Sequence, residues 1–324
     1  MSIKKAHRRI LYGIILVLVL VSIQRLLSYK EMPIDDMPTI VREELYCSEN
    51  EWRLIQARNF NNYQKLPINA NASIEQFSSD KSMMAISYML EESWHLFIQN
   101  ADGTSKDYPL STWFANIQTA APLVLQGELY LAVEMDDGKK VYEIDKDVPV
   151  WLSDINVDRF SFQKGRWTVC NSILYYISPH EENPLCGDLI SSETGTVINR
   201  SVEFVGTYGN ELVWRKQFFP LLYKIMIGDG KKGRVIHTDF WLETDIRPNA
   251  FDISENGIIM MPILYSNYSD VDLYFVDIYT GEWNYLPQDI EFWNREKSVY
   301  TGVNFEFFEM TTAENHGDDF RDSI

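Results

Sequence analysis

The chain has 324 residues, enough for one large β domain or two smaller domains. Its formal net charge at pH 7 is −18, and so acidic a surface repels phosphate backbones and argues against nucleic acid as a partner. Three cysteines, without a CxxC pair or a histidine at ligand spacing, argue against a disulfide framework and a zinc site, and we predict no metal and no cofactor.

The N-terminal segment is predicted to anchor the chain in a membrane. Residues 1–9 are a basic stub with the run KKAHRR, and residues 10–28 are an apolar stretch that begins ILYGIILVLVLVSIQ. This stretch is just long enough to cross a bilayer as a helix, and the positive-inside rule keeps the basic stub in the cytoplasm. A cleavable signal peptide is the alternative, although no small-residue A-x-A site follows the apolar run. We expect a single-pass protein of the cell membrane with most of the chain outside the cytoplasm.

A linker and a large β domain follow the anchor. Residues 29–43 contain two prolines and several charges, which is typical of a linker. Between residues 44 and 310, short runs of β-branched and aromatic residues alternate with turn residues, and no long segment has a helical period. This pattern predicts many short antiparallel strands.

Two segments of this domain align element by element and define a repeated unit. Residues 77–110 read FSSDKSMMAISYMLEESWHLFIQNADGTSKDYPL, and residues 251–287 read FDISENGIIMMPILYSNYSDVDLYFVDIYTGEWNYLP. Each begins with an aromatic residue and a polar turn, continues with two apolar strands, and reaches a late turn that contains glycine. Similar late turns recur about every 45 residues, near the length of a four-stranded propeller blade. They contain Asp102, Asp145, Thr194, Asp229 and Thr280.

The two ends of the domain are expected to combine. Residues 49–68 and residues 298–310 each hold too few strands for a blade of their own. Because the first and last blades of a propeller commonly exchange strands, we predict that these ends together form the closing blade. The predicted fold class is therefore all-β, a β-propeller of about six blades, with five or seven as the alternatives.

The units at residues 77–110 and 251–287 resemble the repeat of TolB-type β-propellers. That repeat has an aromatic residue, a Ser/Pro-Asp-Gly turn, an apolar strand, a charged hairpin and a glycine turn. Lys81 stands where that family has its turn glycine, and the resemblance covers two units. It implies a propeller outside the cytoplasm with a binding or scaffolding role, and it carries over no catalytic residue.

Three tryptophans, Trp113, Trp151 and Trp241, are the candidate ligand contacts. They lie in the predicted connections between units, and such loops border the faces of the ring. Tryptophans in or beside predicted strands are expected to pack between blades instead. These are Trp94, Trp167, Trp214 and Trp283.

Acidic pairs make an exported carbohydrate-active enzyme, a glycoside hydrolase or lyase, the alternative function. A glycosidase needs two carboxylates about 5–10 Å apart, here at the ring axis. Most of the candidates fall at predicted hairpin tips, where acids suit turns and solvent, so we prefer the structural interpretation. The candidates are Asp136, Asp137, Glu181, Glu182, Asp270, Asp272, Glu306 and Glu309.

Three other features have structural interpretations. The run GDGKKG at residues 228–233 satisfies GxGxxG, but the following RVIHTDFW predicts a strand, so a hairpin turn is preferred to a dinucleotide site. A disulfide between Cys170 and Cys186 is one alternative, and part-buried thiols are preferred. Residues 311–324 are predicted to be a disordered acidic tail.

The predicted function is that of a non-catalytic binding, scaffold or sensor module outside the cytoplasm. The expected partners are the membrane, through the N-terminal helix, and an envelope or extracellular protein, peptide or glycan.

Overall fold

The computed structural model describes most of the predicted β domain. Its described residues are 41–48, 51–56, 63–69, 71–80, 82–183, 186–219, 222–240, 244–246, 252–253, 257–265, 270–289 and 300–304. The chain divides into two compact units, Met1–Met37 and Pro38–Ile324, and all described residues belong to the second. The predicted stub, anchor and acidic tail lie outside the described residues. In the part described, no helix is long and apolar enough to cross a bilayer.

The described secondary structure is β strand except for one 3-10 helix, η2 (Leu110–Thr112), which confirms the all-β prediction. The first strand begins at Val41, slightly before the predicted start of the domain at residue 44. The strands are β1 (Val41–Ser48), β2 (Glu51–Gln56), β3 (Tyr63–Asn69), β4 (Ser73–Ser79), β5 (Met83–Leu90), β6 (Ser93–Asn100), β7 (Ser105–Pro109), β8 (Ile117–Leu125), β9 (Glu128–Met135), β10 (Gly138–Asp145), β11 (Val148–Ile155), β12 (Trp167–Cys170), β13 (Ile173–Pro179), β14 (Gly187–Ser191), β15 (Thr196–Tyr208), β16 (Glu211–Phe219), β17 (Leu222–Gly228), β18 (Gly233–Phe240), β19 (Thr244–Ile246), β20 (Asp252–Ile253), β21 (Ile258–Tyr265), β22 (Asp270–Asp277), β23 (Trp283–Asp289) and β24 (Tyr300–Asn304).

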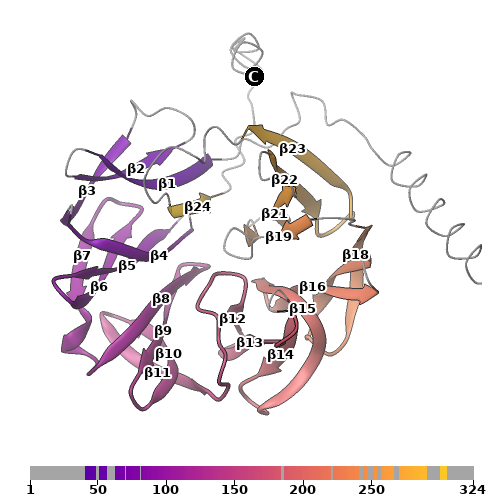
Figure 1. The fold of residues 1–324 in the computed structure, drawn as a ribbon, viewed down its shortest axis with the longest axis horizontal. Coiled ribbons are helices and arrows are strands. Elements are labelled where there is room, and N and C mark those ends of the chain that lie inside the picture. The colour runs from indigo at the N-terminus through magenta and orange to yellow at the C-terminus, as the bar shows by residue number, and fades with distance from the viewer. Residues whose placement is uncertain are drawn as a thin grey trace, which may run out of the picture. The chain divides into compact units, whose positions relative to one another are not determined.

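These strands form five antiparallel sheets, which we call A to E. Sheet A has the order β24-β1-β2-β3, sheet B is β4 to β7, and sheet C is β8 to β11. Sheet D runs from β12 to β18, and sheet E has the order β19-β21-β22-β23 with β20 also paired to β21. Apart from β24, the sheets follow one another in chain order (Figure 1).

Tight turns connect many of the strands. Glu91 and Glu92, which join β5 to β6, both have positive φ angles of 49° and 65°. Such two-residue turns match the right-handed twist of the strands that they connect. The same pattern recurs between β10 and β11 and between β12 and β13, where the sequence likewise lacks the usual Asn-Gly signal.

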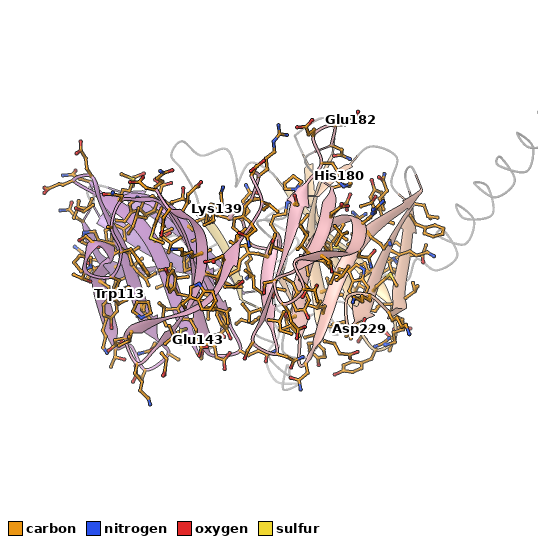
Figure 2. All side chains as sticks on the ribbon, turned by 90° about the horizontal axis from the view of Figure 1, so that it is seen from below. Trp113, Lys139, Glu143, His180, Glu182 and Asp229 are labelled. Atoms are coloured by element: carbon orange, nitrogen blue, oxygen red, sulfur yellow. The ribbon has the colours of Figure 1, made fainter. Side chains whose placement is uncertain are left out.

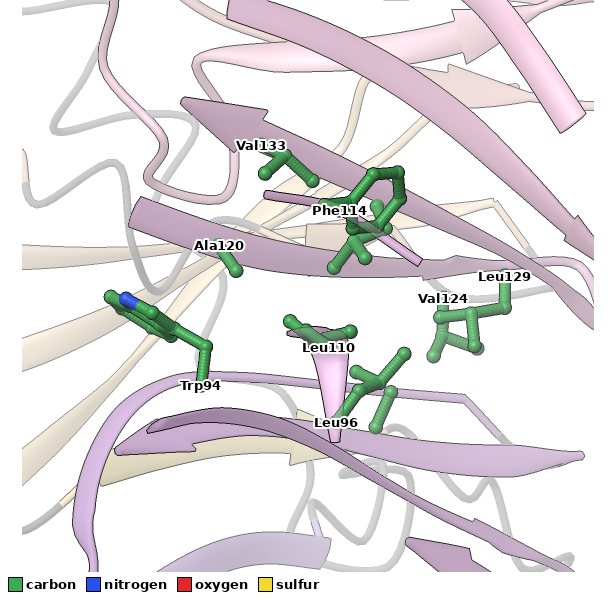
Figure 3. Close-up of a cluster of buried hydrophobic side chains, with 10 residues drawn as sticks. Trp94, Leu96, Leu110, Phe114, Ala120, Val124, Leu129 and Val133 are labelled. Carbon is green, nitrogen blue, oxygen red and sulfur yellow. The ribbon is translucent and has the colours of Figure 1, made fainter. Parts of the chain in front are cut away.

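Apolar clusters join neighbouring sheets. Between sheets B and C, Trp94 and Leu96 of β6 share one buried cluster with Ala120 and Val124 of β8, and Leu110 of η2 belongs to it (Figure 3). Similar clusters join sheet A to B, C to D, and D to E. Because burying one large aliphatic side chain contributes about 1.5–3 kcal/mol, these clusters are the main source of stability.

Strand β15 belongs to two halves of sheet D. Its first part pairs with β14 from Thr196 to Val202, and its second part pairs with β16 from Val202 to Tyr208. The pairing with β16 is irregular between Val202 and Phe204, where one strand partner gives way to the other. Sheet D is therefore continuous although its two ends pair through different parts of one strand.

A buried charged cluster lies at this crossing. Arg215 of β16 is 1% exposed and forms an ion pair with Glu203 of β15. Arg166, which precedes β12, donates from its guanidinium to the Glu203 carbonyl oxygen at 2.8 Å. The Arg215 guanidinium also lies 3.9 Å above the ring of Tyr223 on β17. The cluster connects both halves of sheet D through side chains.

The C-terminal strand joins the first sheet, as predicted. Strand β24 pairs with β1, from Val41 opposite Asn304 to Leu45 opposite Tyr300, and it also lies beside β4 (Figure 1). The two ends of the domain thus share one sheet. The number of blades stays a prediction.

The preferred interpretation of the cysteines is confirmed for two of them. Cys170 and Cys186 are free and buried, and strand β13 separates them, so they lie near opposite ends of that strand. Cys47 lies in β1.

Candidate functional site

Two of the three candidate tryptophans lie at the boundary between sheets B and C. Trp113 directly follows η2 in the connection between these sheets, as predicted, and is half-buried. Trp151 was expected in a connection, but it lies within β11, because the two-residue turn at Lys146 and Asp147 lets the strand begin at Val148. Trp241 lies outside the described residues.

An aromatic strip runs along this boundary and consists of Tyr108, Trp113, Phe114, Tyr142 and Trp151. The ring centroids of Tyr108 and Trp113 lie 4.9 Å apart, and those of Trp113 and Phe114 lie 6.2 Å apart. Phe114 in turn lies 4.7 Å from Tyr142, whose Cα partner across β10 and β11 is Trp151. Opposed residues of an antiparallel pair share one face of the sheet, so Trp151 extends the row to the outermost strand of sheet C.

The strip is most buried in its middle and most exposed at Trp151. Phe114 is buried and packs against the core between sheets B and C, whereas Tyr108, Trp113 and Tyr142 are half-buried. Trp151 is 58% exposed, and its indole N–H donates to Asp154 Oδ1 at 3.2 Å. This bond restrains an aromatic ring that otherwise faces solvent.

Ion pairs flank the strip on both sides. Lys106 of β7 pairs with Asp147 in the turn between β10 and β11, and thereby connects sheet B to sheet C. The hydrogen bond from Lys106 lowers the pKa of Asp147, and the nearby hydroxyl group of Tyr108 adds to this effect. Lys140 pairs with Asp137 and lowers the pKa of that carboxyl group in the same way. Both acids are therefore fully ionised at neutral pH and are poorly suited to exchange protons there.

Burial raises the pKa values of the two tyrosines in the strip. For Tyr108 the carboxylate of Asp147 adds to this effect, and for Tyr142 burial is the largest cause. Both phenols therefore stay protonated at neutral pH, so the strip presents aromatic faces and hydroxyl groups without phenolate charge.

The acids proposed for a glycosidase serve other purposes where the structure describes them. Asp136 accepts hydrogen bonds from Asn116 and Gln118, and it lies with Asp137 in the turn between β9 and β10. Glu181 and Glu182 are exposed in the loop after β13. Figure 2 shows Glu182 at the opposite end of the sheets from Asp229. For Asp270 and Asp272 only the strand, β22, is described, and Glu306 and Glu309 lie outside the described residues.

The shifted carboxyl groups do not resemble a catalytic pair. The pKa values of Asp102 and Asp229, like those of Asp137 and Asp147, are lowered by hydrogen bonds. A general acid needs the opposite shift, so these four groups lack the property that glycoside hydrolysis requires of one carboxyl group.

The GDGKKG run forms the hairpin between β17 and β18, as predicted. Asp229 Oδ1 accepts hydrogen bonds from the backbone N–H groups of Lys231 and Lys232 at 2.8 and 2.6 Å. A phosphate-binding loop would direct these N–H groups at its ligand, but here they bind Asp229. Such a loop is also followed by a helix, whereas this one is followed by strand β18.

The described histidines have separate partners. His95 stacks on Tyr88 with centroids 5.0 Å apart, whereas His180 lies 3.0 Å from an oxygen of Asp188. His237 Nδ1 lies 3.2 Å from a backbone carbonyl oxygen. Within the described ranges, no group of three or more metal-ligating side chains converges.

Sequence reasoning missed Tyr108, Tyr142 and the ion pair between Lys106 and Asp147. One local signal existed, because a two-residue turn after residue 145 brings Tyr142 opposite Trp151. The contacts with sheet B depend on packing between sheets, which no local pattern reports.

Comparisons with known proteins agree with the fold and transfer no function. No family model and no curated protein matches the chain. TolB from Acinetobacter baumannii is similar over 84% of this chain and 68% of its own, with 11% identity and a TM-score of 0.49. The similarity to a structure of a nidogen/laminin complex covers 81% of this chain and 97% of that chain, with 9% identity and a TM-score of 0.46. The similarity to the β-propeller domain of the Trilobed protease from Pyrococcus furiosus covers 84% of this chain and 80% of that chain, with 10% identity and a TM-score of 0.44. The resemblance to TolB-type propellers is therefore weak and concerns the fold alone.

Proposed function

We propose that this protein is a non-catalytic binding module that its N-terminal segment holds at the outer surface of a cell membrane. The observation that carries the binding role is the aromatic strip, with Trp151 exposed at its outer end. An aromatic surface beside a few fixed polar groups is the usual composition of a ligand site. The membrane location rests on the apolar stretch at residues 10–28.

The electrostatics favour binding over hydrolysis. The carboxylates beside the strip, Asp147 and Asp137, have lowered pKa values and bind lysines of this chain. An enzyme of the glycosidase class requires one carboxyl group with a raised pKa near a second carboxylate. The groups beside the strip are instead suited to hold a ligand.

We also infer a propeller of six four-stranded units. Sheets A, B, C and E contribute one unit each, and sheet D contributes two that share β15. The strand exchange between β24 and β1 supports closure of such a ring.

Binding without turnover is tested on the full-length chain in detergent. The protein is applied to printed glycans and peptides, and any bound glycan is assayed for the release of new reducing ends. We expect binding without release, and we expect it to weaken in Trp151→Ala but not in Phe218→Ala. Phe218 is a matched control because it is a similarly exposed aromatic residue in sheet D. Release of reducing ends would instead establish the carbohydrate-active enzyme.

The location is tested separately in intact cells. A tag at the C-terminus of the full chain is expected to be removed by protease added outside the cells. A tag that resists protease until the cells are lysed would contradict the proposed orientation.

A further inference from the structure

We propose that the aromatic strip binds a neutral glycan, with one sugar ring stacked on Trp151. This inference rests on the proposed binding function and assigns its ligand class. The carrying observation is an indole that is 58% exposed but held by a 3.2 Å hydrogen bond to Asp154. A restrained ring with an open face is prepared for stacking, because little side-chain freedom remains to be lost on binding.

Strand β11 exposes hydrophobic side chains on both of its faces. Val148 and Val150 on the same strand are 57% and 49% exposed. Among the described residues, three of the seven exposed large hydrophobic side chains therefore lie on β11. Val148 and Val150 are paired with Asp145 and Glu143, so they lie on the opposite face of β11 from Trp151, and the stacking surface is the Trp151 face alone.

The charges around the strip favour a neutral ligand. Lys106 and Lys140 are neutralised by Asp147 and Asp137. The hairpin of β10 and β11 contains three lysines and four acids, so its net charge is near zero although the whole chain carries −18. This part of the surface exerts little net attraction on ions, yet it offers carboxylate acceptors and ammonium donors. A sugar matches both properties, because its C–H face is apolar and its rim carries hydroxyl groups.

The edge of sheet C is poorly suited to a partner strand. Strand β11 contains Pro149, which has no N–H to donate, and its pairing with β10 is irregular opposite Val141 and Tyr142. Proline and bulges are the features by which edge strands avoid pairing with another chain. A second copy of this chain is further disfavoured by its net charge of −18. The occupant should therefore use the side-chain surface and not the backbone edge.

Figure 2 labels Trp113 among the side chains of the N-terminal sheets. Trp113 lies behind the exposed part of the strip, because it is half-buried and packs against Tyr108 and Phe114. Trp113 therefore supports the strip from within, and Trp151 is the ring to test.

The experiment uses the full-length chain in lipid nanodiscs, immobilised on an interferometry sensor. The soluble probes are three neutral polysaccharides (an α-glucan, a β-glucan and a mannan) and one anionic polysaccharide. We expect saturable binding to at least one neutral polysaccharide, with little change when the salt concentration is raised about tenfold. Trp151→Ala should weaken it by about tenfold or more, Trp151→Phe by less, and Phe218→Ala by less than about twofold.

Several outcomes would overturn the assignment. The first is that Trp151→Ala binds the neutral polysaccharides as tightly as the wild-type protein. The second is that the protein binds only the anionic polysaccharide and releases it at high salt. Binding of printed peptides but of none of the three polysaccharides, with dependence on Trp151, would refute the glycan and retain the binding module. If the protein unfolds cooperatively, and is therefore folded, but binds no glycan and no peptide, both proposals are refuted. Near-ultraviolet circular dichroism of each variant verifies its fold.

Discussion

The ion pair between Arg215 and Glu203 provides a quantitative test of how the halves of sheet D are held together. Replacing Arg215 with methionine leaves the Glu203 carboxylate, whose side chain is 13% exposed, without its charged partner. Losing one member of a buried ion pair costs about 3–5 kcal/mol, and the lost contact with the Tyr223 ring adds about 0.5–2 kcal/mol. We therefore expect Arg215→Met to lower the free energy of unfolding by about 4 kcal/mol.

The same argument predicts that a second substitution reverses part of this loss. When Glu203→Leu is added to Arg215→Met, the buried carboxylate that lost Arg215 is removed as well, whereas the buried Arg166 keeps its hydrogen bond to the backbone carbonyl of residue 203 but loses the nearby carboxylate. The double variant should therefore be more stable than Arg215→Met alone and less stable than the wild-type protein. Lys140→Met is the matched control, because its ion pair with Asp137 lies at the surface, where solvent screens it and its loss should change the stability little.

Urea unfolding of the full chain in detergent, followed by tryptophan fluorescence, measures these free energies. The reasoning is refuted if Arg215→Met costs no more than Lys140→Met. It is also refuted if the double variant loses as much as the sum of the two single variants, because the pair would then contribute through packing and not through charge.

Three further predictions concern stability and use the same unfolding measurement. Ser87→Ala removes a 2.7 Å hydrogen bond to the Ala120 carbonyl oxygen between sheets B and C and should cost about 1–3 kcal/mol; wild-type stability would contradict this. Gly187→Ala should lower the free energy of unfolding by at least about 1 kcal/mol more than Gly195→Ala. The new Cβ at residue 187 would lie 2.2 Å from a backbone oxygen, whereas at residue 195 the Cβ has open space and the only cost comes from the positive φ. Equal costs would refute the predicted clash. Burial raises the pKa of Cys186 to about 12, so its neutral thiol favours the folded state below pH 9, and this contribution is lost as the pH rises from 9 towards 12. Above pH 9, wild-type stability should therefore fall about 1.4 kcal/mol per pH unit faster than that of Cys186→Ala; parallel curves would contradict the shift.

The sequence predicted those parts of the fold that are local or that repeat. The late turn at residues 100–103, the hairpin of GDGKKG and the strand exchange between both ends of the domain all followed from turn residues and periodicity. Strand β15 could not be divided in this way, because Thr196–Tyr208 is one uninterrupted run whose change of partner depends on β14 and β16.

The site was only partly predictable for a similar reason. Trp113 and Trp151 were identified as aromatic candidates, but their connection through Phe114 and Tyr142 exists only once sheets B and C pack together.

The polar groups between neighbouring sheets suggest why the ligand surface should lie on outer strands. Where β4 and β5 meet β8, Ser78 accepts from the Val124 N–H at 2.9 Å, and Ser87 donates to a backbone carbonyl. In sheet D, the hydroxyl of Thr207 bonds both Thr168 and a backbone carbonyl of β12. These hydroxyl groups are buried and form hydrogen bonds that connect strands, so replacing them should lower the free energy of unfolding. The exposed ring of Trp151 has no comparable packing role, and its replacement should change binding while leaving stability within about 0.5 kcal/mol of the wild-type value. A large loss of stability in Trp151→Ala would mean that the ring is part of the core, and the argument for a ligand surface on β11 would fail with it.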